Sequence, residues 1–227
     1  MDAVPTTKLA IEQIAERITD AVMEHRLPPG IKLVEEKLAT AFGVSRTKIR
    51  QALTVLAKEG LVTLHANRGA FVTRPSAAEA RDLFATRRLV EPEIVRNVIA
   101  RACEKDLARL HQHLVAESEA RQEGDRRRII RLSGQFHMLL AEVSGNKFIE
   151  KLMAELCPLT CLIIALYDAP QTPACPEDEH KLIVEAIAAH DETAAIRLML
   201  HHLEHIECEL QLDAEPERDI HWETLYG

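Results

Sequence analysis

The fold of this chain is decided by one stretch, FGVSRTKIRQALTVLAKEGLV at residues 42–62, which has the pattern of a tight turn followed by an amphipathic helix. Ser45 is a good N-cap residue for that helix, and Gly60 is suited to its C-terminal end. Between them an apolar stripe recurs at helical spacing: Ile49, Ala52, Leu53 and Leu56. The stretch therefore predicts a helix that packs one face against a core.

The opposite face of this helix carries only hydrogen-bonding or cationic side chains. At about 100° per residue, four of them point away from the apolar stripe: Thr47, Gln51, Thr54 and Lys58. Arg46 and Arg50 lie one turn apart at the edge of the apolar stripe. Such a face is suited to phosphates and base edges, so we predict that this helix enters DNA.

Two more helices are predicted before it. Residues 34–43 show a short helical pattern that Gly43 ends, so the order is helix, tight turn, reader helix. A longer helix is predicted within residues 9–27, where PPG at 28–30 breaks it. Three helices in this order are typical of a helix-turn-helix domain.

A hairpin is predicted directly after the reader helix. Residues 61–65 and 70–73 are two extended runs around the turn 66–69, which places Arg68 at the tip of a wing. Helix, turn, helix and basic-tipped hairpin together predict a winged helix-turn-helix domain. The alternative is a small helical subdomain whose basic face is only solvated.

At these residues the chain resembles the GntR family of transcription regulators. The resemblance is carried by SRTKIRQAL at 45–53, by Gly43 and Gly60, and by LPPG at 27–30. In that family the Arg-Thr pair and the second arginine of the reader helix contact phosphates and base edges, and the wing-tip glycine approaches the minor groove. The resemblance implies these roles for four residues here: Arg46, Thr47, Arg50 and Gly69.

Two positions of the reader helix depart from the family's pattern. Lys48 stands where most members have proline, and Gln51 stands where many have glutamate. Neither change disturbs the predicted fold, but both alter the surface that would face an operator. The predicted DNA contacts are Ser45, Arg46, Thr47, Lys48, Arg50, Gln51, Arg68 and Gly69.

Charge is divided unevenly along the chain. The formal net charge of the 227 residues is −8, which by itself argues against a nucleic-acid-binding protein. Residues 1–75, however, contain 11 Lys+Arg and 8 Asp+Glu, whereas residues 76–227 contain 17 and 28. Only the first part has the cationic excess that phosphate contacts require. The acidic second part is expected to do something other than bind DNA.

The composition, 47% apolar and 28% charged, is that of an ordinary globular protein. No apolar run approaches the roughly 20 residues that span a bilayer, and the N-terminus lacks a basic segment followed by an apolar one. A cytoplasmic protein with no membrane partner is expected. The five cysteines are scattered, which favours free thiols, although Cys157 and Cys161, one helical turn apart, leave a metal or redox pair as an alternative.

From residue 77 to about 210 the chain shows only helical periods separated by turn signals, so the fold class is mainly α. Six helices are predicted, with a seventh left open: about 77–101, 105–122, 125–143, 147–167, 177–190 and 191–211. Pro92 and Pro158 fall inside two of them and are expected to kink or split each helix. The predicted organisation is a winged helix-turn-helix domain at 1–74, a linker at 75–80, an all-α domain at 81–212 and a polar tail at 213–227.

Three histidines fall on the apolar faces of three different predicted helices. His180 and His202 lie within their stripes, and His137 lies on the edge of another, one turn after Ser133. Each alone is consistent with a core imidazole that hydrogen-bonds to a neighbour. Three together favour a shared site, and three imidazoles suit zinc or another borderline divalent metal with an open coordination position.

The first helix of this domain adds a pair of opposite charges. Arg87 and Glu91 are four residues apart in the same stripe as the apolar residues Leu83 and Phe84. A buried charge is costly unless it is paired. Arg87 is therefore expected to be held by Glu91 or by an anionic ligand.

The resemblance extends into this domain, which is similar to the FCD-type ligand-sensing domain of the FadR branch of the GntR family. It is carried by Phe136-His137, by SGN at 144–146, by Glu179-His180 and by Met199 with His202-Leu203. Many members of that branch bind a metal through an aspartate and three histidines, and bind a small carboxylate there with help from an arginine on the first helix. The resemblance implies His137, His180 and His202 as the metal ligands and Arg87 as the arginine.

Ser133 stands at the place of the family's aspartate, one turn before His137. A hydroxyl is a poor metal ligand, so three possibilities stay open. Three histidines suffice for the metal, or an effector carboxylate completes its shell, or the metal is lost and the histidines bind an anion directly. The predicted effector site is Arg87, Ser133, His137, His180 and His202.

These features favour a repressor-type transcription regulator that binds a palindromic DNA operator as a homodimer and responds to a small carboxylate, at a divalent metal such as zinc or nickel. One alternative is a regulator that senses the metal itself. Another is a metalloenzyme that activates water at three histidines. The chain lacks His-Glu-x-x-His, Gly-x-Ser-x-Gly and a glycine-rich phosphate loop, so no enzyme is predicted.

Overall fold

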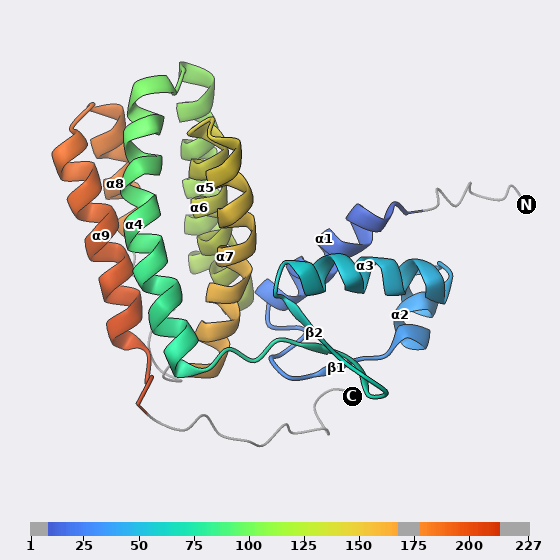
Figure 1. Cartoon of the computed structure of the whole chain (residues 1–227). Coiled ribbons are helices and arrows are strands. Elements are labelled where there is room, and N and C mark those ends of the chain that lie inside the picture. The colour runs from blue at the N-terminus through green and yellow to red at the C-terminus, as the bar shows by residue number, and fades with distance from the viewer. Residues whose placement is uncertain (1–8, 168–177, 214–227) are drawn as a thin grey trace, which may run out of the picture.

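The computed structural model describes residues 9–167 and 178–213. Within them, the N-terminal part consists of three helices and a small sheet (Figure 1). In chain order these are α1 Ile11–Met23, β1 Lys32–Leu33, α2 Glu35–Phe42, α3 Arg46–Lys58, β2 Val62–His65 and β3 Gly69–Val72. This is the predicted winged helix-turn-helix.

The reader helix α3 begins and packs as its sequence predicts. The Ser45 hydroxyl oxygen accepts a hydrogen bond from the backbone N–H of Lys48 at 3.3 Å, which caps the helix. Gly43 has a φ of 64° in the left-handed region, and this allows the tight turn between α2 and α3. The buried residues of α3 are those of the predicted stripe: Ile49, Ala52, Leu53 and Leu56.

The wing is one strand larger than the predicted hairpin. β2 and β3 pair antiparallel, with Leu64 opposite Ala70. β1 pairs with the other edge of β3, with Leu33 opposite the same Ala70, so the strand order is β1-β3-β2. A strand of two residues is too short to show alternation, which is why no sequence pattern predicted β1.

The C-terminal part is a helical bundle (Figure 1). Six helices lie within its described residues: α4 Ala77–Arg101, α5 Glu104–Gln122, α6 Arg126–Val143, α7 Lys147–Tyr167, α8 Glu179–Ala188 and α9 Glu192–Glu209. α4 starts directly after Ser76, whose side chain and Glu79 form a capping box. Of the predicted polar tail, only Asp213 belongs to the described residues.

Two prolines were expected to kink or split their helices, and neither of them splits one. Pro92 lies inside α4 and Pro158 lies inside α7, and each helix continues through its proline. Both prolines are buried, so packing against neighbouring helices stabilises the helix despite the missing N–H. In α7 the hydroxyl of Thr160 also donates to the carbonyl of Leu156 at 2.9 Å, near the interruption.

The two parts of the molecule pack against each other through α1, α6 and α7 (Figure 1). Leu162 of α7 belongs to the apolar core of the N-terminal part, whereas Met23 of α1 belongs to a core of the bundle. A Cβ on Gly134 of α6 would lie 2.7 Å from Cε of Met23 and 3.2 Å from Sγ of Cys161, so α1 and α7 both approach α6 closely at this glycine. His25 adds a hydrogen bond from Nε2 to the carbonyl of Cys161 at 2.9 Å.

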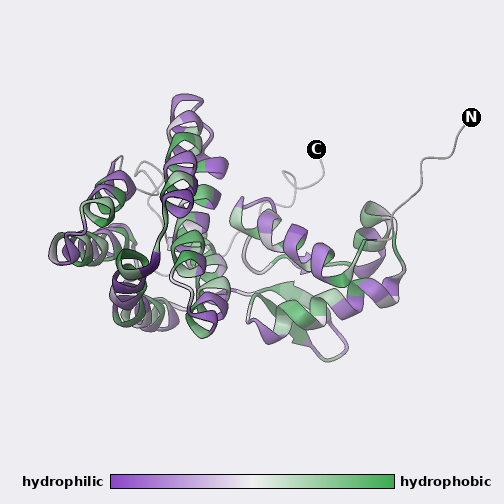
Figure 2. Ribbon diagram, turned by 90° about the horizontal axis from the view of Figure 1, so that it is seen from above, coloured by the Kyte–Doolittle hydropathy of each residue, from purple (hydrophilic) through white to green (hydrophobic). Residues whose placement is uncertain are grey.

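Hydrophilic and hydrophobic residues are mixed along the helices of the bundle in Figure 2, as expected for helices that cover a core with one face. None of the helices in the described residues has the length and apolar character to cross a membrane. The four described cysteines are free thiols. Burial raises the pKa of Cys157 and Cys161 to about 12, which keeps both thiols protonated at neutral pH and argues against a redox pair there.

Candidate functional site

The outward face of α3 is open to solvent. Four predicted DNA contacts on this helix are exposed: Arg46, Thr47, Arg50 and Gln51. Ser45 is exposed before it, and Lys48 is half-buried. The core stripe thus turns the cationic and hydrogen-bonding side chains of α3 away from the protein, where they can meet a groove.

A carboxylate on α2 holds the two arginines of the reader helix. Arg50 donates from Nε and Nη2 to the two oxygens of Glu35, at 2.9 and 2.8 Å, and Nη2 of Arg46 lies 3.8 Å from Glu35 Oε2. The hydrogen bond from Arg50 lowers the pKa of Glu35. A two-point contact orients the guanidinium of Arg50, so Glu35 is a functional candidate that sequence reasoning missed.

The wing places two cations beside one aromatic ring. Arg68 is exposed in the turn, and its guanidinium carbon lies 5.9 Å from the ring centroid of Phe71. Nζ of Lys32 on β1 lies at the same 5.9 Å from that ring. Gly69 has a φ of 97°, where a side chain would be strained. Lys32 therefore joins Arg68 and Gly69 in the candidate DNA interface.

Replacement of Arg50 by alanine is expected to weaken binding to a specific DNA site by about 1–3 kcal/mol and to leave the fold intact. Arg96→Ala, which removes the same charge from the exposed surface of α4, is the control and should have little effect. Fluorescence anisotropy on a selected duplex and on a random duplex measures both. Equal losses on the two duplexes would show that Arg50 contacts only phosphates.

The three predicted metal-ligating histidines converge inside the bundle. Nε2 of His202 on α9 lies 3.2 Å from Nε2 of His137 on α6 and 3.1 Å from Nε2 of His180 on α8. No more than 2% of any of the three residues is exposed. Phe136 stacks on His180 with the ring centroids 4.0 Å apart. The predicted position of each histidine on the inner face of its helix is therefore confirmed, and the packing of the helices brings the three side chains together.

A carboxylate holds the far nitrogen of each of these histidines. Nδ1 of His137 lies 2.6 Å from Glu91 Oε2, Nδ1 of His180 lies 2.9 Å from Glu117 Oε1, and Nδ1 of His202 lies 2.7 Å from Glu179 Oε2. A carboxylate accepts, so each Nδ1 carries the proton and each Nε2 presents a lone pair to the centre. Carboxylate, histidine and metal in this order form the usual outer shell of a metal site.

The three carboxyls are ionised despite their surroundings. Burial would raise the pKa of Glu91, but the charge of Arg87 and the contact with His137 outweigh it and hold the pKa at about 2. Burial likewise opposes ionisation of Glu179, and hydrogen bonds from His202 and His205 hold its pKa at about 2. Glu117 also has a pKa below its usual range, because His180 and His113 outweigh its burial.

Protonation of the histidines in this centre is unfavourable. Burial, the largest cause, lowers the pKa of His137 to about 4 and that of His202 to about 3, although Glu91 and Glu179 act in the opposite direction. His137 and His202 are therefore neutral at pH 7, and the Nε2 of His202 faces those of His137 and His180 at 3.2 and 3.1 Å. A tetrahedral ion with bonds of about 2.0–2.1 Å to nitrogen separates its ligands by about 3.3 Å. The centre therefore fits a metal ion.

The metal-free protein is expected to lose stability as the pH falls below about 6.5, the pKa of unfolded histidine. The folded state keeps His137 and His202 neutral down to about pH 4 and 3, whereas the unfolded chain protonates them. Each histidine then lowers the free energy of unfolding by about 1.4 kcal/mol per pH unit. Denaturant titrations in chelator at pH 7.5, 6.5, 5.5 and 5.0 measure this, and a constant stability from pH 6.5 to 5.0 would contradict it.

Arg87 is buried behind His137. Its Nε donates to Glu91 Oε1 at 2.6 Å and its Nη1 donates to the Thr160 hydroxyl at 3.2 Å. One carboxylate, Glu91, therefore joins the guanidinium to the imidazole of His137. Nη2 of Arg87 is buried and has no hydrogen-bond partner within the described part of the chain. A buried, unsatisfied donor on a charged group is costly and suits an anionic acceptor.

Ser133 is buried on α6, one turn before His137. It lies on the helix that carries the first histidine, where an aspartate would be a further ligand. Its hydroxyl provides a neutral oxygen and no charge. The negative charge of this centre therefore comes from the three carboxylates behind the histidines.

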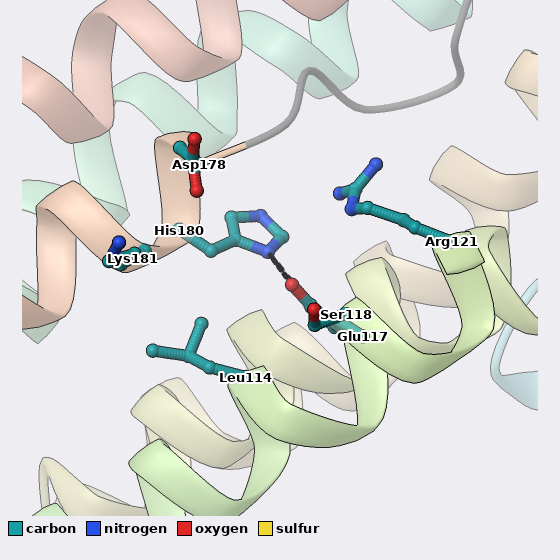
Figure 3. Close-up of a pocket in the computed structure, with 7 residues that line it drawn as sticks. All are labelled: Leu114, Glu117, Ser118, Arg121, Asp178, His180 and Lys181. Carbon is teal, nitrogen blue, oxygen red and sulfur yellow. Dashed lines mark hydrogen bonds and ion pairs between the residues drawn. The ribbon is translucent and has the colours of Figure 1, made fainter.

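A pocket of about 160 Å³ opens beside His180 (Figure 3). Figure 3 shows the His180 ring between α8 and α5, joined to Glu117, with the side chain of Leu114 below it. The remaining lining residues are polar or charged: Ser118, Arg121, Asp178 and Lys181. Two of these are cations and one is a carboxylate, and of the three histidines only His180 lines the pocket.

The comparisons with known proteins agree with this architecture. The family model described as "Bacterial regulatory proteins, gntR family" matches residues 10–72, and the model described as "FCD domain" matches residues 82–205. The chain belongs to the GntR family. The GntR match contains the whole reader helix, and the FCD match contains all three histidines and their carboxylates.

Relatives of this GntR-family chain are transcription regulators. YdhC of Bacillus subtilis, an HTH-type transcriptional regulator, is 30% identical over 200 residues, which are 87% of this chain and 88% of that protein. RspR of Escherichia coli, an HTH-type transcriptional repressor, is 26% identical over 199 residues, 86% of each. The structure of a GntR transcriptional regulator from a Rhodococcus species has a TM-score of 0.76 and 27% identity, and covers 90% of this chain and 98% of that one.

Sequence reasoning on this GntR-family regulator found the three histidines, Arg87 and Glu91 but missed two supporting carboxylates. Glu179 directly precedes His180, a proximity that could have suggested a role. Glu117 gave no signal, because it reaches His180 from another helix at a separation of 63 residues. Only the packing of α5 against α8 brings that pair together.

Proposed function

We propose that this GntR-family regulator holds a divalent metal ion at His137, His180 and His202 and responds to a small carboxylate that binds there. The observation that carries the proposal is the convergence of three Nε2 lone pairs, each imposed by a carboxylate on the opposite nitrogen. With a metal bound, the domain would have a Lewis acid with open coordination positions for an effector carboxylate.

Zinc or nickel are the metals we propose. Three imidazole nitrogens suit borderline divalent metals, whereas magnesium and calcium prefer sets of oxygen ligands. Ser133 is not proposed as a charged ligand, so an effector carboxylate or water completes the shell. Three ionised carboxylates within the site balance the charge of the ion and of Arg87.

The effector arginine we propose is Arg87. The unsatisfied Nη2 supports this, because an effector carboxylate would give that donor an acceptor. Glu91 keeps Nε occupied and so fixes the guanidinium plane. Arg121 and Lys181, which line the pocket beside His180, would supply positive charge for an approaching anion.

We propose that the regulator acts as a homodimer on a palindromic operator, as a repressor, and that the bundle supplies the dimer contact. One α3 reads few base pairs, so two readers at a fixed spacing are needed for specificity. The contact of α6 with α1 supports coupling between the sites, because α6 carries both His137 and the glycine that receives Met23. Effector binding would then bias the placement of the two reader helices.

A regulator that senses the metal itself is the second candidate. It is favoured by the hydrogen bonds that Arg87 already makes to Glu91 and Thr160. They leave only one of the three guanidinium nitrogens for an effector. In that case metal alone would change operator affinity. No catalytic role is proposed, since the relatives are transcription regulators.

One titration separates these candidates. Operator binding of the metal-free chain is measured with zinc or nickel alone, with a panel of mono- and dicarboxylates alone, and with both. The proposal expects a response to carboxylate that requires metal and is lost in Arg87→Gln, whereas Arg96→Gln, an exposed control on the same helix, retains it. A response to metal alone would favour the metal sensor, and no bound metal in protein purified without chelator would contradict both.

A further inference from the structure

Beside the three-histidine centre, α9 carries two more histidines on the adjacent, more exposed part of its surface. His201 and His205 are one helical turn apart, with their ring centroids 6.0 Å apart. Glu179 at the start of α8 faces both: its Oε1 lies 2.7 Å from Nδ1 of His205 and 3.7 Å from Nδ1 of His201. One donor atom from each of the three lies within 4.8 Å of the others.

We infer that Glu179, His201 and His205 form a second, outer site for a divalent metal ion. Two imidazole nitrogens and a carboxylate oxygen are a usual donor set for zinc, nickel or copper. Two histidines at positions i and i+4 present their rings on the same face of a helix, so little rearrangement is needed. The side chain of His201 is 67% exposed and that of His205 is 36% exposed, so water would complete the shell.

The outer site is expected to bind more weakly than the inner centre. It has two imidazoles in place of three, and its exposed ligands lose side-chain freedom when they bind an ion. Its second oxygen neighbour, Glu209 Oε1, lies 3.9 Å from Nε2 of His205, on the other side of that ring. Metal binding at the outer site requires no metal at the inner centre. The outer-site proposal can therefore be tested separately from the proposed function.

Glu179 links the outer site to the inner centre. Its Oε2 accepts from Nδ1 of His202 at 2.7 Å, while its Oε1 would ligate the outer ion. An ion on Oε1 withdraws charge from the carboxylate and weakens it as the acceptor that orients His202. Two neighbouring cations also repel each other. Occupancy of the outer site should therefore lower the affinity of the inner one, and the reverse by the same factor.

Calorimetric titration of the metal-free, full-length chain with zinc tests the outer site. Wild type is expected to show two classes of site, one tight and one weaker. His201→Ala, an exposed change, should retain the tight class and lose the weaker one, while His137→Ala should do the opposite. His111→Ala, which removes an exposed histidine from α5, is the control and should leave both classes unchanged.

The shared carboxylate gives a second, independent readout. Glu179→Gln should weaken both classes, the inner one by roughly 10–100-fold. Glu117→Gln, which supports only His180, should weaken the inner class alone. The outer site is overturned if wild type binds only the single equivalent of zinc that His137→Ala removes, or if His201→Ala leaves the number and affinity of bound ions unchanged. Wild type that binds zinc only in the weaker class, which His201→Ala abolishes, would instead count against the inner centre.

Discussion

Replacement of His202 by alanine is expected to abolish tight binding of a divalent metal ion. Its Nε2 is the middle donor of the inner centre, at 3.2 Å from that of His137 and 3.1 Å from that of His180. Without it the remaining two imidazoles have no third nitrogen to close the site. The loss in affinity should exceed the roughly 10–100-fold that removal of a supporting hydrogen bond costs.

Metal analysis after desalting, together with far-ultraviolet circular dichroism, measures this effect. His111→Ala is the matched control, because it removes one exposed histidine that lies on α5, outside the centre. Wild type and His111→Ala should keep about one tightly bound ion and gain thermal stability from added zinc. A folded His202→Ala protein that retains a full equivalent would show that the metal lies elsewhere.

Replacement of Glu91 by leucine is expected to destabilise the protein by about 3–5 kcal/mol. Glu91 is 1% exposed and is the only carboxylate that the described residues place in an ion pair with Arg87. Its loss leaves a buried guanidinium without a counter-charge, and it also removes the acceptor of His137 Nδ1. Denaturant titration of the metal-free protein at pH 7.5 gives the free energy of unfolding.

The double variant Arg87→Met/Glu91→Leu separates the two roles of Glu91. Removal of both charges leaves no uncompensated ion, so most of the stability should return. Metal affinity should stay low, because His137 still lacks the partner that fixes its tautomer. Equal instability of the single and double variants would show that packing around Glu91, and not its charge, is what stabilises this region.

Helix periodicity accounts for much of what could be predicted here. The apolar stripe of α3 defined the buried residues of the reader helix, and the stripes of α6, α8 and α9 placed His137, His180 and His202 on the buried faces of their helices. These are local patterns, because the side of a helix on which a residue lies depends on its own neighbours in the chain. The pairing of Arg87 with Glu91 follows from the same rule.

Contacts between elements could not be predicted in the same way. Glu35 reaches Arg50 across a turn, and Glu117 reaches His180 from a separate helix, so neither pairing has a spacing that a sequence pattern records. The strand β1 is two residues long and is defined only by its pairing with β3. The helices around Pro92 and Pro158 stay whole because tertiary packing outweighs the local cost of proline.

The substitution at Ser133 shows how the two kinds of information combine. By itself, a serine at the place of a metal-ligating aspartate leaves the presence of a metal open. The supporting carboxylates answer part of that question, because Glu91, Glu117 and Glu179 fix the tautomers of all three histidines. A centre made only to bind an anion would instead present N–H donors to it.

X-ray absorption spectroscopy of the chain loaded with one equivalent of zinc tests the central claim most directly. The three-histidine centre predicts about three imidazole nitrogens at about 2.0–2.1 Å, completed by oxygen, with an added carboxylate effector changing only the oxygen shell. A spectrum with sulfur ligands, or with two or fewer imidazoles, would contradict the assignment of the metal to His137, His180 and His202.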